Sequence, residues 1–410
     1  MGEAMKSFPL ACASAAVAQI AHGHDALTQK VDAAVPMSKV PASRRSAALE
    51  SFSLGQPGTA STSVSASAVG VKRILIVTDA WHPQVNGVVR TLDNTARELE
   101  SMGIEVQMLT PLQFRTLPCP TYPEIRLSIT SPQRVMRMIE ALDVDALHIA
   151  TEGPLGWCAR HCAISRGWRF TTAYHTRFPE YVQARTGRAL EASYRLLAWF
   201  HRAAHKVLAP TPAIAQVLRN RGFGQVENWS RGVDHAVFYP RVEQAMYPRR
   251  DEPIFLSAGR LSVEKNITAF LDLDLPGQKW VAGQGPLEQS LRKRYPQVQF
   301  LGLLDPDALA MAYSQADVFV FPSRTDTFGL VMAEAMACGL PVAAFPVPGP
   351  VDVVGQSGAG VMDQDLRQAC LSCLDVARVA AIERAAAFTW ARASTQFLDA
   401  LVPMRARSES

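Results

Sequence analysis

The sequence lacks features that several large classes of protein require. Its 410 residues contain no run of eighteen or more apolar residues, so it predicts no membrane-spanning helix. The seven cysteines are scattered and odd in number, which favours a reducing cytoplasm over a disulfide framework. The formal net charge is only +4, which is too balanced to indicate a nucleic-acid partner, although local basic faces remain possible. The sequence therefore does not favour a nucleic-acid-binding protein.

What remains is the composition of a globular protein. Hydrophobic residues make up 48% of the chain and charged residues 19%, enough apolar material for two domains of ordinary size. Residues 1–70 differ from the rest because they are rich in Ala and Ser, without the strong apolar run of a secretory signal. We expect this segment to be a disordered tail that lies outside the fold.

Strand and helix patterns alternate from residue 71 onwards. Arg73–Thr78 (RILIVT) is a continuous apolar run, as a strand buried on both faces requires. Apolar residues then recur at helical spacing from Val88 to Leu99, and Glu105–Thr110 reads as a second strand. Further strands are predicted at Ala146–Ile149, Arg169–Tyr174 and Lys206–Ala209. Strands that alternate with helices predict a parallel sheet with right-handed crossovers.

The same alternation restarts at Ile254–Ala258 (IFLSA). It continues through predicted strands at Lys279–Ala282, Val298–Leu301, Asp317–Phe321 and Pro341–Phe345. A linker is predicted around residues 238–252, where prolines and a charge cluster interrupt the pattern. The predicted fold class is α/β, with two Rossmann-like, doubly wound parallel-sheet domains facing a cleft. Ligands of such folds bind outside the carboxyl ends of the strands.

A loop-to-helix segment follows the apolar strand DVFVF and reads SRTDTFGLVMAEAMACG over residues 323–339. Leu330–Cys338 are strong helix formers, so Gly329 lies where the chain turns from loop into helix. A helix N-terminus presents free N–H groups and the positive end of its dipole, which suits a diphosphate. The predicted backbone donors are those of Phe328, Gly329 and Leu330.

Two carboxylates on this segment, Asp326 and Glu334, are separated by seven residues. Asp326, before the turn, can accept hydrogen bonds from sugar hydroxyls, and Glu334, in the helix, can accept them from a ribose. This arrangement resembles the acid–seven residues–acid motif of family 4 glycosyltransferases, which have the GT-B fold and retain the anomeric configuration. The resemblance implies that Asp326 contacts the donor hexose and Glu334 the nucleotide ribose. The first acid is usually Glu in that family, and Asp326 is one methylene shorter.

Arg260 and Lys265 are the predicted cations of the site. They lie in SAGRLSVEKN (residues 257–266), which begins on a strand and continues into a loop. Arg, through its planar fork, and Lys, as a point charge, can neutralise a pyrophosphate leaving group. The segment resembles the family's Gly-Arg-Leu…Glu-Lys segment, which implies that both cations bind the donor diphosphate.

Two further segments resemble the family's. Asn86 and Gly87 lie in DAWHPQVNGVVR, where Gly87 permits a ligand to approach the backbone closely. The resemblance implies that donor phosphate and acceptor meet at this loop, although a plain tight turn explains one glycine equally well. His175 lies in AYHTRFPEY and resembles the family's histidine near the reacting sugar. A histidine without such context is more often structural.

The resemblance covers about residues 71–402 and implies a division of the chain. Residues 71–240 would form a Rossmann-like acceptor domain, and residues 241–385 a Rossmann-like domain for the nucleotide-sugar donor. Residues 386–402, which include FTWARASTQFL, would form a helix that returns to the first domain.

The predicted chemistry needs no metal ion and no cofactor, because protein cations and the helix dipole would stabilise the departing nucleoside diphosphate. The TDTFG and PVPGPVD segments resemble those of GDP-mannose-dependent mannosyltransferases and of sulfoquinovosyl- and glycolipid-forming enzymes. The resemblance thus implies GDP-mannose or a UDP-hexose as donor, and a diacylglycerol-type lipid or a carbohydrate as acceptor. The C-x-x-C pair, Cys370 and Cys373, is expected to pack within a helix rather than to bind a metal.

Residues 185–206 suggest a contact with a membrane. Plotted as one helix, they place Leu190, Tyr194, Leu197 and Ala204 on one side. The opposite side carries Trp199 among the cations Arg188, Arg195, Arg202 and Lys206. A tryptophan within a basic face suits an anionic lipid surface, although a solvated face with one packed tryptophan is a competing interpretation. The expected location is therefore cytoplasmic, with a peripheral contact to the inner membrane still open.

Two other functions stay open at this point. One is a non-catalytic nucleotide-sugar-binding protein, in which Asp326 marks the loss of activity. The other is a nucleotide-sugar epimerase or a phosphorylase with the same two-domain architecture. These enzymes need other acid–base residues or a pyridoxal-phosphate lysine, and no motif of the sequence indicates either.

Overall fold

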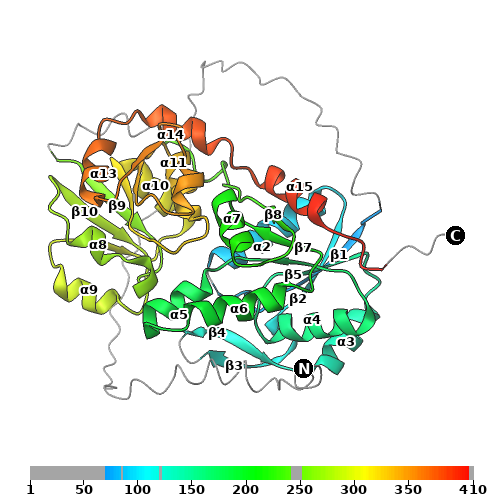
Figure 1. The fold of residues 1–410 in the computed structure, drawn as a ribbon. Coiled ribbons are helices and arrows are strands. Elements are labelled where there is room, and N and C mark those ends of the chain that lie inside the picture. Colours follow the sequence, from blue (N-terminus) through cyan, green and yellow to red (C-terminus); the bar gives the residue numbers. More distant parts are fainter. Residues whose placement is uncertain (1–69, 85, 120–121, 242–251, 406–410) are drawn as a thin grey trace, which may run out of the picture. The chain divides into compact units, whose positions relative to one another are not determined.

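The computed structural model describes residues 70–84, 86–119, 122–241 and 252–405, so the predicted tail and most of the predicted linker lie outside it. Within these ranges the chain forms two six-stranded sheets in which all strand pairs are parallel (Figure 1). The predicted α/β fold with two Rossmann-like sheets is confirmed.

The first sheet has the strand order β2-β1-β5-β6-β7-β8. Its strands are β1 (Arg73–Val77), β2 (Glu105–Leu109), β5 (Ala146–Ile149), β6 (Thr171–Ala173), β7 (Lys206–Ala209) and β8 (Val226–Asn228). The helices that follow them are α2 (Gly87–Ser101), α3 (Pro132–Ala141), α4 (Pro154–Arg166), α5 (Phe178–Thr186), α6 (Leu190–His201) and α7 (Pro212–Asn220). We call these elements the first half.

The second sheet has the strand order β11-β10-β9-β12-β13-β14. Its strands are β9 (Ile254–Ala258), β10 (Gln278–Ala282), β11 (Gln299–Gly302), β12 (Val318–Phe321), β13 (Val342–Ala344) and β14 (Gly360–Met362). Its helices are η4 (Val263–Lys265), α8 (Thr268–Leu271), α9 (Glu288–Arg294), α10 (Pro306–Gln315), α11 (Leu330–Ala337), α12 (Pro350–Val353), α13 (Leu366–Cys373) and α14 (Arg378–Ala385). We call these elements the second half.

Helices cover both faces of each sheet because the central strands are apolar on both sides. Residues Ile74–Val77 of β1 are fully buried. Leu75 packs in a cluster with side chains of α3 and α4, whereas Ile76 packs on the other face with side chains of α2. Alternate side chains of a strand point to opposite faces, so one apolar run contributes side chains to the cores on both faces of the sheet.

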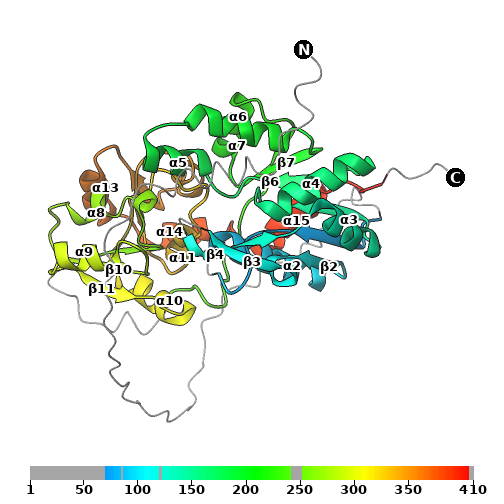
Figure 2. The ribbon, with the colours of Figure 1, turned by 90° about the horizontal axis from the view of Figure 1, so that it is seen from below.

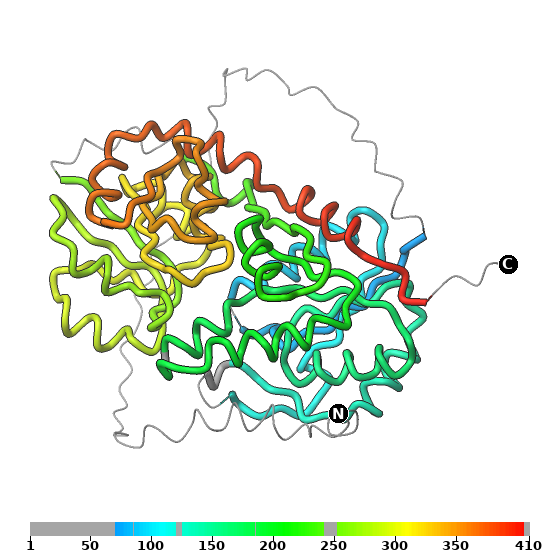
Figure 3. The backbone as a smooth tube through the Cα atoms, viewed as in Figure 1, coloured from blue at the N-terminus to red at the C-terminus, as the bar shows by residue number. Residues whose placement is uncertain are grey.

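The last helix, α15 (Trp390–Ala400), belongs to both cores. Trp390, at its start, packs in a cluster of the second half with α11 residues. Phe397, near its end, packs in a cluster of the first half with Leu92 and Leu99 of α2. The red segment in Figure 3 follows this course across to α2. A returning C-terminal helix is therefore present, while the domain boundaries proposed from the sequence stay a prediction.

Two parts of the fold differ from what the sequence predicted. An antiparallel hairpin, β3 (Arg115–Cys119) with β4 (Tyr122–Ile129), follows the short helix η2 (Pro111–Gln113), where no strand was expected. The expected single helix over residues 185–206 is wrong. It divides into the end of α5, the helix α6 and the start of β7, and Figure 2 shows α5 and α6 as separate helices.

The break between α5 and α6 has a local cause. α5 ends at Thr186, Gly187 caps it with a φ of 68°, and Ala189 has a φ of 73°, so the backbone leaves the helical region before α6 begins. At its other end α6 stops at His201, and Lys206 lies in β7, where it forms an ion pair with Glu227 and does not extend the basic face of α6. Cys370 and Cys373 are buried in α13, which confirms that they pack within a helix.

Candidate active site

The pairing of β9 with β12 brings the predicted cations and the first acid together. β9 lies between β10 and β12, where the order of the second sheet changes direction, and ligands of such sheets bind at this point. The loop after β9 carries Arg260 and Lys265, and the loop after β12 carries Asp326. Lys265 Nζ lies 2.5 Å from Asp326 Oδ1, and the aspartate side chain is only 13% exposed. The two residues that the sequence assigned to one site are therefore in contact, while their role in binding a donor stays a prediction.

Gly329 is required at the turn into α11. Its φ is 80°, a left-handed conformation that side chains disfavour. A β-carbon at this position would lie 2.8 Å from Phe321 Cζ and 2.8 Å from Met332 Cε, so any other residue would have to displace these two side chains. Phe328 beside it is 4% exposed and packs edge-to-face on Phe388. The predicted helix therefore begins where expected, at Leu330, and its start is rigidly held.

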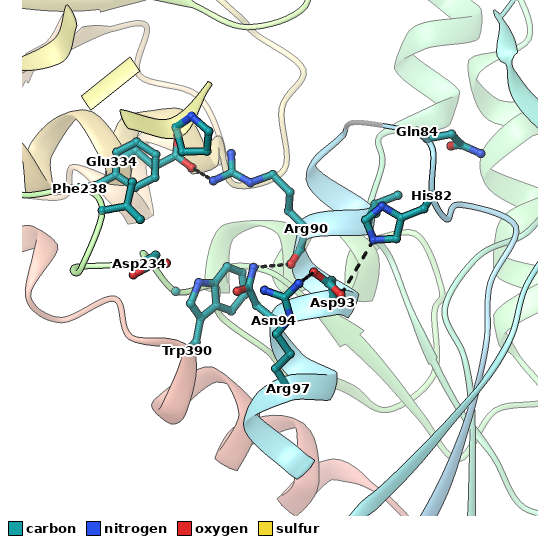
Figure 4. A pocket seen from close by; sticks show the side chains of 14 residues that line it. His82, Gln84, Arg90, Asp93, Asn94, Arg97, Asp234, Phe238, Glu334 and Trp390 are labelled. Atoms are coloured by element: carbon teal, nitrogen blue, oxygen red, sulfur yellow. Dashed lines mark hydrogen bonds and ion pairs between the residues drawn. The ribbon is translucent and has the colours of Figure 1, made fainter. Parts of the chain in front are cut away.

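Glu334 is buried on α11 and forms an ion pair with Arg90, which reaches it from α2 (Figure 4). Its side chain is 2% exposed, that of Arg90 38%. Burial raises the pKa of Glu334 above its ordinary value, and Arg90 opposes this effect by favouring the charged carboxylate. Only Oε1 is engaged in the pair, while Oε2 is buried and has no hydrogen-bond partner among the described residues.

Gly87 also approaches the start of α11. A β-carbon on Gly87 would lie 3.7 Å from Leu330 Cδ1, so the N-termini of α2 and α11 lie close together. Asn86, in contrast, has a structural task. Its side-chain oxygen accepts hydrogen bonds from the backbone N–H groups of Val88 and Val89 and thereby caps α2. A contact between Asn86 and substrate stays a prediction.

His175 follows β6 in the first half and is held at two points. Its backbone carbonyl accepts a 2.8 Å hydrogen bond from Thr327 Oγ1, next to Asp326. Its Nδ1 lies 3.2 Å from Arg231 Nη2. Burial lowers the pKa of His175 well below the ordinary 6.5, and the charge of Arg231 lowers it further. Nε2 is buried without a hydrogen-bond partner in the described part of the chain.

The segment from Asp326 to Glu334 is thus the point where the predicted residues meet. Lys265 reaches it from the second half, and Gly87, Arg90 and the His175 carbonyl reach it from the first half. Three of the predicted residues, Glu334, Arg260 and Lys265, line cavities, and they line two different ones. Glu334 lines one of about 240 Å³, with Arg90, Asp93, Asp234 and Trp390 (Figure 4). A second, of only about 20 Å³, is lined by Arg260 and Lys265.

Sequence reasoning missed several residues of this site, among them Arg90, Arg231 and Thr327. Arg90 is three residues after Gly87 on the same helix, so helical spacing places it on the same face and was an available signal. No comparable pattern points to Arg231, because its contact with His175 joins distant parts of the chain. In the described ranges, no group of three or more His, Cys, Asp or Glu side chains is arranged to hold a metal ion.

Comparison with known proteins agrees with this geometry. The model of "Glycosyltransferase Family 4" matches residues 85–237, and that of "Glycosyl transferases group 1" matches residues 252–375. The sulfoquinovosyl transferase of Arabidopsis thaliana is 32% identical over 67% of this chain and 60% of its own length. A GDP-mannose-dependent alpha-mannosyltransferase of Mycobacterium tuberculosis is 30% identical over 71% of this chain and 83% of its own. The alpha-monoglucosyldiacylglycerol synthase of Streptococcus pneumoniae is 25% identical over 74% and 78%.

A solved structure, the sucrose-phosphate synthase of Thermosynechococcus elongatus, superposes with a TM-score of 0.63 at 22% identity. The superposition covers 80% of this chain and 97% of that one, which supports the GT-B fold alone. The two family models, by contrast, cover strands of both sheets and both acids of the motif. The chain belongs to glycosyltransferase family 4 and is a hexosyltransferase of that family.

Proposed function

We propose that the chain is a retaining, metal-independent hexosyltransferase that moves mannose or a related hexose from a nucleotide diphosphate to a diacylglycerol-type lipid. The observation that carries the proposal is a set of unsatisfied polar atoms around one segment. Asp326 Oδ2, Glu334 Oε2 and His175 Nε2 are all buried, and none has a hydrogen-bond partner within the described residues. A buried polar atom left unpaired costs about 1–3 kcal/mol. The hydroxyl groups of a hexose and a ribose would satisfy all three.

The leaving group would be stabilised by protein cations. The Lys265 ammonium has three N–H donors, so one can hold Asp326 while the others bind a diphosphate oxygen. Arg260 lines the same small cavity and adds a planar pair of donors. Positive charge placed where negative charge develops lowers the barrier for departure of the nucleoside diphosphate. The acceptor hydroxyl would attack from the same face of the sugar and pass its proton to the leaving phosphate, so that configuration is retained.

The names of the relatives support the choice of substrates. One is a GDP-mannose-dependent mannosyltransferase, and another makes alpha-monoglucosyldiacylglycerol. Together they favour GDP-mannose or a UDP-hexose as the donor, and a glycerolipid over a carbohydrate as the acceptor. The contacts between Asp326 and the hexose and between Glu334 and the ribose are part of this proposal.

The helix α6 supports a peripheral contact with a membrane. Leu196 and Trp199 are each 43% exposed, and Arg195 and Arg202 are exposed on the same stripe. Trp199 stacks on Trp157 with ring centroids 5.4 Å apart, so its position is fixed at the surface. Apolar and cationic side chains on one exposed stripe suit an anionic lipid surface. None of the helices in the described part is both long and apolar enough to cross a membrane.

A donor panel tests the proposal. GDP-mannose, UDP-glucose, UDP-galactose and UDP-sulfoquinovose would each be incubated with the protein in EDTA, with diacylglycerol vesicles or with water alone. We expect nucleotide release from one donor that depends on the lipid, and the anomeric proton coupling of the product identifies retention.

Each other outcome has a defined meaning. Release only after a divalent metal is added would disprove metal independence. Release with an added sugar but not with lipid would replace the glycerolipid by a carbohydrate acceptor. Tight nucleotide binding without release from any donor would favour the non-catalytic alternative.

A further inference from the structure

Arg231 is a buried cation beside the candidate site. It lies just after β8 and is 4% exposed. Its guanidinium stacks over the Trp229 ring at 4.5 Å and donates to the carbonyls of Trp229 and Ser230 at 2.5 and 2.9 Å. Its remaining partner is His175 Nδ1, at 3.2 Å. All three acceptors are uncharged, although a buried charge is costly to maintain without a counter-charge.

The contact with His175 fixes where the imidazole carries its proton. A guanidinium has only donors and no acceptor. His175 Nδ1 must therefore offer its lone pair to Arg231, and a neutral ring then has its proton on Nε2. A doubly protonated ring would point an N–H group at the N–H groups of Arg231 and add a second positive charge beside the first.

The groups that surround His175 all oppose its protonation. Burial has the largest effect, followed by the positive charge of Arg231, and then by His148 and His201. The Trp229 ring packs edge-to-face on it at 5.5 Å and contributes no negative charge. Burial also lowers the pKa of the Arg231 guanidinium to about 9, which still leaves it charged at neutral pH. His175 therefore stays neutral over the physiological range.

We propose that Arg231 is a positioning residue that holds His175 as the neutral Nε2–H tautomer. His175 then donates a hydrogen bond to an oxygen of the bound sugar and is not the base that takes a proton from the acceptor. The Thr327 contact holds the backbone of His175 beside Asp326, and Arg231 orients its ring. The identity of the ligand rests on the proposed function, whereas the tautomer does not.

Histidine ring ¹⁵N NMR on the full-length protein, without any sugar, tests the tautomer. The His175→Gln variant identifies the His175 signals by their loss. We expect a protonated Nε2 and an unprotonated Nδ1 in the wild type down to about pH 5.5, about one unit below the ordinary pKa of histidine. A wild-type ring protonated at Nδ1, or on both nitrogens at neutral pH, overturns the proposal.

The role of Arg231 is tested by Arg231→Met and Arg231→Lys. The methionine variant loses the donor and the charge, so the pKa of His175 should rise and the ring should titrate between about pH 5 and 7. Its kcat should fall about fivefold above about pH 7, where the neutral ring is free to place its proton on Nδ1 and one hydrogen bond from Nε2 is lost. It should recover at lower pH, because the protonated ring carries a proton on Nε2 again. Lysine keeps a donor and a charge, so it should restore the Nε2–H tautomer and most of kcat.

Arg160→Met is the matched control. Arg160 is also a buried arginine that stacks over a tryptophan, Trp199, and donates to backbone carbonyls, but none of its hydrogen bonds goes to an imidazole. Its variant should leave the His175 signals and the shape of the pH profile unchanged.

Unchanged signals and pH profile in Arg231→Met would overturn the role of Arg231. If Arg231→Met does not fold, the wild-type spectrum and Arg231→Lys still decide. A chain with the expected tautomer but no transferase activity would instead refute the proposed function alone.

Discussion

Arg90 and Glu334 form an ion pair that joins the two halves of the molecule at the candidate active site. Arg90 comes from the second turn of α2, and Glu334 from the second turn of α11. The same carboxylate that is proposed to bind the donor ribose is thus already engaged by the half that is proposed to bind the acceptor. One oxygen of Glu334 takes this role, and the other is buried without a hydrogen-bond partner among the described residues.

A double-mutant cycle measures this pair. Arg90→Ala, Glu334→Ala and the double variant would be unfolded in guanidinium chloride, and we expect a favourable coupling of about 1–3 kcal/mol, since one partner is buried. The control cycle uses Arg292 and Glu288, an i,i+4 pair on α9 that lies outside this cavity, where the coupling should stay below about 0.5 kcal/mol. Equal couplings in the two cycles would refute a special role for the pair.

Lys265→Ala should lower kcat by about a hundredfold or more, because the developing charge of the diphosphate loses a directed cation. The folded structure should persist, since the lysine side chain is partly exposed and its pairing with Asp326 is local. Lys293→Ala on α9 is the control, because Lys293 is exposed and its backbone belongs to a helix of the same half. Steady-state kinetics with the preferred donor gives both values. Equal rates in the two variants would exclude Lys265 from the site.

Asp326 can be examined by changing charge and length separately. Asp326→Asn keeps the size but loses the charge that holds Lys265, and kcat should fall at least about tenfold because charge-assisted bonds contribute about 1.5–3 kcal/mol. Asp326→Glu introduces the acid that is usual in the family, and activity should stay within about tenfold of the wild type. Full activity of the asparagine variant would show that the carboxylate is not needed.

Asp79 at the end of β1 gives a prediction for stability against pH. Burial raises its pKa to about 6, although Leu155 and Gly156 donate backbone hydrogen bonds to it. The folded state therefore binds a proton that the unfolded state has already released between pH 3.8 and about 6. The free energy of unfolding falls as pH rises through this window, by about 3 kcal/mol, and stays level above it.

Asp79→Asn should remove this slope, even though the amide satisfies fewer of the backbone donors. Denaturant unfolding at several pH values from about 4 to 7 measures the slope, and the difference from the wild type isolates Asp79. The exposed Asp375→Asn is the control and should keep the slope of the wild type. A slope that survives in Asp79→Asn would assign it to other groups.

The α6 stripe should govern binding to anionic vesicles. Arg195→Glu with Arg202→Glu removes two exposed cations, each worth about 1 kcal/mol near a membrane, so affinity should fall at least about thirtyfold. Co-sedimentation with phosphatidylglycerol vesicles measures this, with Lys293→Glu on the second half as a control. If vesicle binding persists in the Arg195→Glu, Arg202→Glu variant but is lost in Lys293→Glu, the membrane contact lies on another surface.

The parts of the fold that could be predicted are those encoded within one short segment. Ala146–Ile149 and Ile254–Ala258 were placed to the residue, because a short and mostly apolar run is typical of a strand buried on both faces. The hairpin β3–β4 was missed because Pro118 and Pro123 lie within it and proline argues against a strand. The break at Ala189 was missed because a positive φ at alanine leaves no trace in a helical plot.

The residues of the candidate site likewise divide into those that the sequence could predict and those that it could not. Asp326, Gly329 and Glu334 could be recognised because their chemistry depends on spacing along one loop and helix. Arg231 could not, because its contact with His175 depends on the packing of the first sheet. The sequence also does not show that the Asn86 side chain caps α2. An asparagine before a glycine can either cap a helix or bind a ligand.

The helix α15 limits how members of such a family could exchange parts. Its first residue, Trp390, packs in the core of the second half, and its later residues, such as Phe397, pack in the core of the first half. The core of the first half therefore includes residues that follow the second sheet in the chain. A chimera that grafts a foreign second half onto this first half would import an α15 whose side chains were never matched to Leu92 and Leu99. Donor specificity could therefore be transplanted only together with the final turns of the native chain, from about Phe397 onwards, rather than as a self-contained module.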